Sequence, residues 1–222
     1  MQIYFQWRYA QLLPVQDRRA DFDYENSCAI HEIGGGLKVQ LDYCRRADEV
    51  MFNICNNVEN VDVSDFGKKH CVKSIAYHNH FRMKVNKKWM EKFSKTADKS
   101  IELEKFMPDR LSQDITLYQE LPLMACKTNM KYDIANGEEF TVDSFDKINA
   151  TLKYDGTDRT VKIPLKEITQ FFYPSYCITV HKSQGSSFDF PYTIYEFDKF
   201  DERLKYVALS RSTNKNYINI FE

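Results

Sequence analysis

The alternation of apolar and polar residues along the chain predicts an α/β protein. Residues 37–41 alternate at period two and residues 72–77 form a short apolar run, and both patterns are typical of strands. Apolar side chains recur every three or four residues on two helices, one beginning near Ala47 and one over residues 81–93. The order strand, helix, strand, helix favours a mostly parallel sheet with helices on both faces.

The middle of the chain changes to a β pattern, with short apolar segments separated by turn residues. The predicted strands are residues 121–126, 140–142, 148–154 and 160–163, with Asn-Gly at 136–137 and Asp-Gly at 155–156 as turns. Short strands joined by tight turns indicate a small barrel or a curled sheet.

The last fifty residues return to an α/β pattern. Residues 176–180 are β-branched and apolar, as in a buried strand, and a polar turn follows at 181–185. Further strands are predicted at 192–197, 206–209 and 217–221. Because ligands gather at the carboxyl ends of parallel strands, the turn and the pair Ser210 and Arg211 are expected at a working edge of the sheet.

The chain is almost neutral overall but has one locally basic segment. Lys and Arg number 31 and Asp and Glu number 32, so the net charge of −1 excludes a globally basic nucleic-acid coat. Residues 68–110, however, hold 12 Lys or Arg against 5 Asp or Glu. The predicted helix face opposite the apolar one carries Arg82, Lys84, Lys87, Lys88, Lys92 and Lys95. It is either a solvated face or a surface that follows phosphates.

Cysteine, glycine and hydrophobic runs exclude several classes of protein. The six cysteines form no CxxC and no zinc-finger spacing, so no metal site is predicted and the thiols are expected to be reduced. No apolar run approaches the roughly 18 residues of a membrane span, and the first residues do not resemble a signal peptide. We therefore expect an intracellular protein, cytoplasmic or nuclear, without a membrane partner. GxxxxGK[ST], the loop that binds nucleotide phosphates, is absent.

Two segments offer groups for phosphate chemistry. The turn after Thr179 combines a hydroxyl, an imidazole, an ammonium, an amide and a glycine, which suits a phosphate or a plain polar turn. Arg211 could hold two oxygens of a triphosphate and act as an arginine finger, or it could form a surface ion pair.

These same segments resemble motifs V and VI of superfamily 1 helicases of the RecD-like and Pif-type branch. Residues 179–189 read TVHKSQGSSFD, similar to TxHKSQGxxxD, and residues 206–211 read YVALSR, as in motif VI. Weaker resemblances involve motif III at 10–15, motif IV at 40–46, and the segment at 75–79 with Asn86. Residues 121–138 resemble the LPVML…N…NGE entry into the family's small β insert.

The resemblance implies a domain organisation. Residues 1–36 correspond to a remnant of the first motor domain and a linker. Residues 37–128 and 173–222 correspond to a RecA-like second motor domain, and residues 129–172 to a small SH3-like β insert. On this basis the P-loop and the acidic pair for Mg²⁺ would belong to a first motor domain. ATP and Mg²⁺ would be bound only together with that partner, and not by this chain alone.

The resemblance also implies roles for single residues. Arg211 and Arg45 would contact the γ-phosphate, while the nucleotide would also be bound by Gln11, Gln184 and Gly185. The expected contacts to single-stranded DNA are Thr179, His181, Ser183 and Asn79, joined by Lys84, Lys87 and Lys88 from the basic helix.

Three interpretations stay open at this stage. The chain is the C-terminal half of an ATP-dependent DNA helicase, from a split gene, a truncated frame or an excised domain. Alternatively, it is a stand-alone module that binds single-stranded nucleic acid without ATPase activity, or a remnant without a biochemical role. A composition rich in Asn, Lys and Tyr fits an AT-rich genome such as that of a large DNA virus.

Overall fold

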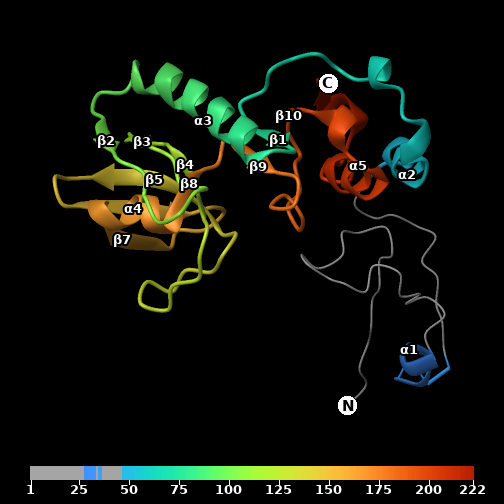
Figure 1. Cartoon of the computed structure of the whole chain (residues 1–222), viewed down its shortest axis with the longest axis horizontal. Coiled ribbons are helices and arrows are strands. Elements are labelled where there is room, and N and C mark those ends of the chain that lie inside the picture. Colours follow the sequence, from blue (N-terminus) through green and yellow to red (C-terminus); the bar gives the residue numbers. More distant parts are fainter. Residues whose placement is uncertain (1–27, 34, 37–46) are drawn as a thin grey trace.

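The structure is a computed structural model, and it describes residues 28–33, 35–36 and 47–222 (Figure 1). The strand predicted at 37–41 and the site residues Gln11 and Arg45 lie outside the described residues. Within the described residues the sequence forms an α/β fold with one parallel and two antiparallel sheets.

A four-stranded parallel sheet forms the centre of the fold, in the order β11-β10-β1-β9. Its strands are β1 (Ser74–Ala76), β9 (Cys177–Thr179), β10 (Tyr192–Ile194) and β11 (Ile218–Ile220). Every residue of these strands is buried, which is expected of a parallel sheet covered on both faces. Four of the strands predicted from apolar runs are thereby confirmed.

The strand predicted at 206–209 is wrong, because these residues belong to the helix α5 (Glu202–Leu209). The Asp201 side chain caps the helix by accepting a hydrogen bond from the Leu204 backbone nitrogen at 2.8 Å. Leu204, Val207 and Ala208 then form its buried face at helical spacing. A short apolar run does not by itself distinguish a strand from a buried helix, and here the cap and the spacing favour the helix.

Both helices predicted from three- and four-residue spacing are present. They are α2 (Glu49–Asn56), capped by the Asp48 side chain, and α3 (Asn79–Ser94). The remaining helical segments are α1 (Cys28–Ile33), α4 (Leu165–Phe171) and the 3-10 turns η1 (Val58–Asn60), η2 (Val63–Asp65), η3 (Phe197–Lys199) and η4 (Lys215–Tyr217). Among the described residues, no helix has both the length and the apolar character needed to cross a bilayer.

Successive residues of the central strands enter two different cores. Ala76 and Cys177 pack into the core that includes α3, whereas Ile75 and Ile178 pack into the core that includes α2 and α5. This alternation follows from the period of two in a strand. The sheet therefore has helices on both faces, as the sequence predicts, and Figure 1 shows α3 on one side and α2 and α5 on the other.

A five-stranded antiparallel sheet in the order β7-β6-β5-β4-β8 lies next to α3 and shares its core (Figure 1). Its strands are β4 (Pro122–Ala125), β5 (Glu139–Phe145), β6 (Asn149–Tyr154), β7 (Thr160–Pro164) and β8 (Phe172–Pro174), and β2 (Ile101–Leu103) pairs separately with β3 (Ile115–Leu117). Gly137 (φ +94°) and Gly156 (φ +71°) occupy the predicted turns. The SH3-like character of this part and the domain boundaries stay predictions.

Asn86 joins α3 to the start of β9. Its side-chain nitrogen donates to the carbonyl oxygens of Pro174 at 2.8 Å and Cys177 at 3.0 Å, and its oxygen accepts from the Cys177 backbone nitrogen at 2.7 Å. Asn86 is fully buried, so these hydrogen bonds have no competition from water. This amide therefore fixes the strand that leads into the turn at 181–185.

We expect Asn86→Ala to lower the free energy of unfolding by about 3 kcal/mol. The reason is that at least the buried Cys177 N–H would lose its partner, at a cost of about 1–3 kcal/mol for each unsatisfied group. Urea unfolding followed by circular dichroism measures this change. Asn53→Ala, at an exposed position of α2, is the control and should change stability by less than about 0.5 kcal/mol. Equal effects of the two substitutions would contradict the role of Asn86.

Candidate functional site at the carboxyl edge of the parallel sheet

The carboxyl ends of β1 and β9 bring two predicted site residues to the same edge. Ala76 is in register with Thr179, and the Val180 backbone nitrogen donates to the Ala76 carbonyl oxygen at 3.0 Å. Asn79 begins α3 three residues after β1, and Thr179 is the last residue of β9. Parallel pairing thus places these two residues at one edge, where the sequence predicts a site.

The turn at 181–185 is closed by its own hydrogen bonds. The Ser183 hydroxyl donates to the Val180 carbonyl oxygen at 2.8 Å, and the Ser183 backbone nitrogen donates to that of Thr179 at 3.0 Å. Gly185 has a φ of +96°, a conformation that favours glycine. Ser183 is therefore buried within the turn, whereas His181, Gln184 and Gly185 are exposed.

Arg211 lies against this turn, although it follows the helix α5 and not the strand expected at 206–209. Its Nη1 donates to the carbonyl oxygens of Ser183 at 3.2 Å and Ser186 at 3.0 Å. Its Nε donates to the Val207 carbonyl oxygen at 2.8 Å, and only 3% of the residue is exposed. The guanidinium therefore connects the end of α5 to the turn, and it is not the exposed ion pair that was the alternative from sequence.

Lys182 connects the turn to the antiparallel sheet. Its Nζ donates at 2.6 Å to the side-chain oxygen of Asn136, at the turn before β5. Burial lowers the pKa of Lys182 below its ordinary value. The sequence analysis did not predict this contact, because it joins residues 46 positions apart.

Arg82 does not belong to the exposed basic face, which corrects the prediction from helical spacing. It is 3% exposed and donates from Nη2 to the Leu111 carbonyl oxygen at 2.8 Å, and its guanidinium stacks 4.7 Å from the Tyr173 ring centre. Its Nε donates to the Asn79 side-chain oxygen at 3.2 Å. Burial lowers the pKa of Arg82. Residues distant in sequence, Leu111 and Tyr173, contact this side chain. Arg82 is therefore buried, and it orients the Asn79 side chain through a hydrogen bond.

Lys84, Lys87 and Lys88 are exposed and share one face of α3. They lie about 8–14 Å along the helix axis from Asn79, at 1.5 Å per residue. Lys87 forms an exposed pair with Glu91 at 3.9 Å, an interaction that contributes little to stability in water. The three ammonium groups are accordingly available to phosphates in solution.

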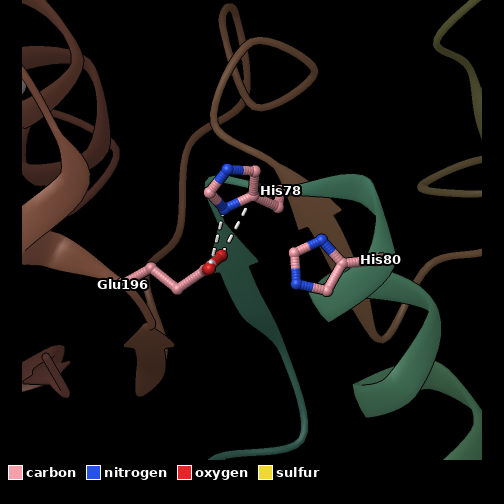
Figure 2. A group of neighbouring side chains, drawn as sticks. All are labelled: His78, His80 and Glu196. Atoms are coloured by element: carbon pink, nitrogen blue, oxygen red, sulfur yellow. Dashed lines mark hydrogen bonds and ion pairs between the residues drawn. The ribbon is translucent and has the colours of Figure 1, made fainter.

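The same edge also holds a residue that the sequence analysis missed. Glu196 follows β10, and its carboxylate contacts His78, which follows β1 (Figure 2). The two residues are 118 positions apart, and no motif in the sequence connects them. Only the pairing of β1 with β10 brings them together.

Comparison with protein-family models gives no match. A curated relative, the "ATP-dependent DNA helicase Pif1" of Campylobacter jejuni subsp. jejuni serotype O:2, is 36% identical over 88 residues. The match spans 39% of this chain and 19% of the relative.

Solved Pif1 structures match most of this chain. Bacteroides Pif1 bound to ssDNA matches 82% of it and 51% of that protein, with a TM-score of 0.64 and 22% identity. This chain has the fold of Pif1 helicase domains. The match with Pif1 from Candida albicans covers 79% of this chain and 54% of that protein, with a TM-score of 0.57 and 18% identity. The resemblance to the Pif-type branch is thus confirmed, and the chain spans about half the length of these Pif1 structures.

Neither the Pif1 comparisons nor the geometry assigns a ligand to single residues of this chain. The nucleotide contacts of Arg211, Gln184 and Gly185 stay predictions, as do the DNA contacts of Thr179 and His181. The same holds for the other residues named from the motifs, which are Gln11, Arg45, Asn79, Ser183, Lys84, Lys87 and Lys88.

We expect Arg211→Ala to lower the free energy of unfolding by about 3 kcal/mol. Two carbonyl oxygens of the turn would lose a charged donor, and hydrogen bonds to charged groups contribute about 1.5–3 kcal/mol each. Urea unfolding measures the loss, with Arg203→Ala, at an exposed position of α5, as the control. A variant as stable as this control would show that the turn does not depend on Arg211.

Proposed function

We propose that this chain is the C-terminal motor half of an ATP-dependent DNA helicase. The observation that carries the proposal is the contact of Arg211 with Ser183 and Ser186, which joins the two helicase-like motifs at one edge of the sheet. The Pif1 fold supports it, as does the Campylobacter jejuni relative, which is named as an ATP-dependent DNA helicase. Such an enzyme also needs the first motor domain, which carries the P-loop.

The nucleotide side of the proposal concerns Arg211, Gln184 and Gly185, together with Gln11 and Arg45 outside the described residues. Gln184 and Gly185 are exposed, and the space beside the Gly185 α-carbon is open. These residues fit the partner side of a nucleotide cleft, whereas GxxxxGK[ST] is absent from the sequence. ATP with Mg²⁺ would be held by the P-loop of the first motor domain and would supply the γ-phosphoryl group that is transferred to water, with ADP as the leaving group.

Arg211 can contribute to this cleft by exchanging its carbonyl partners for the γ-phosphate of ATP. Its donors now bind the carbonyl oxygens of Ser183 and Ser186, and a planar guanidinium can bind phosphate oxygens in the same way. Binding a γ-phosphate from the opposite domain would favour the closed state of the cleft over the open one. Movement of Arg211 would also release the turn, which relays the nucleotide state to the DNA side.

The DNA side of the proposal uses the carboxyl edge and the lysines of α3. Asn79, Thr179 and His181 lie at or beside the edge, and Lys84, Lys87 and Lys88 extend the surface along the helix. Backbone phosphates are the sequence-independent part of single-stranded DNA that such groups bind. The solved Bacteroides Pif1 is described as bound to ssDNA, which supports this ligand here. The antiparallel sheet would correspond to the SH3-like insert beside the strand.

A second candidate function is a single-strand binding module without ATPase activity. The observation that favours it is the lysine face of α3, which is exposed and needs no nucleotide or partner domain. The two functions differ in one measurable property, since only the helicase half contributes to ATP hydrolysis.

Replacing Lys84, Lys87 and Lys88 by Gln should weaken binding to single-stranded DNA. Each lost phosphate contact reduces the magnitude of the slope of log K against log salt by about 0.7. The slope of the triple variant should therefore be smaller in magnitude by up to about 2. Fluorescence anisotropy of a labelled oligo-dT at several salt concentrations measures both quantities.

The matched control replaces three exposed lysines on other elements, Lys105, Lys147 and Lys199, by Gln. It removes the same charge and should leave the slope nearly unchanged. Equal losses in both triple variants would mean that net charge, and not the α3 surface, determines binding.

The chain alone should not hydrolyse ATP, and mixing it with the P-loop half of the Campylobacter jejuni Pif1 should produce DNA-stimulated ATPase activity. Arg211→Lys keeps the charge but loses the planar fork, and it should reduce the restored rate by roughly 10³-fold, as expected of an arginine finger. A coupled phosphate-release assay measures the rate, and circular dichroism verifies folding. Binding of oligo-dT without any restored ATPase activity would favour the single-strand binding module.

A further inference from the structure

His78, His80 and Glu196 form a cluster at the carboxyl edge, between the ends of β1 and β10 (Figure 2). His78 precedes α3, His80 lies in its first turn, and Glu196 follows β10 by two residues. One potential ligand atom from each residue lies within 4.8 Å of the other two. Parallel pairing of neighbouring strands therefore gathers two imidazoles and a carboxylate at one point.

The carboxylate of Glu196 is held in a fixed orientation. One oxygen is 2.9 Å from His78 Nδ1, and the other accepts from the His78 backbone nitrogen at 3.0 Å. The Glu196 side chain is only 13% exposed, whereas that of His78 is 43% exposed and His80 is exposed. The cluster thus has a partly buried, oriented carboxylate and an open side through which an ion can enter.

We propose that His78, His80 and Glu196 bind a zinc ion. Two imidazole nitrogens and one carboxylate oxygen are a ligand set that zinc accepts, and the fourth position would hold water or another oxygen ligand. Ligand atoms about 2.0–2.1 Å from a tetrahedral zinc lie about 3.3 Å from one another. The largest separation of 4.8 Å requires a movement of about 1.5 Å, which a rotation of the exposed His80 ring can provide.

The surroundings of the cluster support this ligand. The backbone nitrogen of His78 can keep its bond to one carboxylate oxygen while the other binds the ion, which is the usual support for a ligating carboxylate.

His80 distinguishes a metal site from a simple ion pair. A pair between His78 and Glu196 needs only those two residues, whereas a zinc site needs the third ligand. Since His80 is exposed and projects from α3, its replacement by Ala should leave the fold intact. The zinc site does not depend on the proposed helicase function, because none of its three residues is assigned to nucleotide or DNA.

The experiment titrates the metal-free full chain with Co²⁺, a spectroscopic substitute for zinc, and then displaces it with Zn²⁺. We expect one Co²⁺ per chain, with visible absorption of a nitrogen and oxygen ligand set and no thiolate-to-cobalt charge-transfer band. His80→Ala, His78→Ala and Glu196→Gln should each weaken the apparent affinity at least about tenfold.

The matched control is His31→Ala, an exposed histidine in α1, which should bind Co²⁺ like the unaltered chain. Circular dichroism of each variant verifies that the fold is kept. Unchanged affinity of a folded His80→Ala variant would overturn the proposal. A thiolate charge-transfer band would also overturn it, because the ion would then be bound by some of the six cysteines.

Discussion

The hydrogen bonds from the buried Arg211 guanidinium to the turn at 181–185 and its next residue are the interaction on which the carboxyl edge depends. The guanidinium and the Ser183 carbonyl oxygen are 28 positions apart in sequence, and their contact holds α5 against the end of β9. A buried cation is costly unless it is well paired, and carbonyl dipoles are suitable partners for it. The turn keeps its shape because its carbonyl oxygens accept hydrogen bonds from the buried guanidinium.

In the proposed helicase, Arg211 would have a structural and a functional role. Carbonyl oxygens and phosphate oxygens can accept from the same guanidinium donors, so a phosphate group would replace the present partners of Arg211. In the proposed helicase, the loss of the contacts with Ser183 and Ser186 would accompany closure of the nucleotide cleft. A small displacement of one arginine would then change the turn that leads to the DNA side.

The parallel sheet brings two separate sets of polar side chains to its carboxyl edge. Between β1 and β9 it places Asn79 and Thr179, while between β1 and β10 it places His78 and Glu196. Both sets arise because the carboxyl ends of parallel strands meet at the same edge. The proposed DNA surface and the proposed zinc site are therefore neighbours with independent chemistry, and evidence against one leaves the other unaffected.

The sequence by itself determined the features that depend on neighbouring residues. Periodic patterns identified α2, α3 and most strands, and consecutive residues carried the resemblance of the segments at 179–189 and 206–211 to helicase motifs. The pattern failed at 206–209, where a short apolar run fits a strand or a helix equally well. Only the tertiary structure decided that Arg82 is buried and that Glu196 meets His78. Those facts depend on contacts between segments far apart in the chain, which no local pattern records.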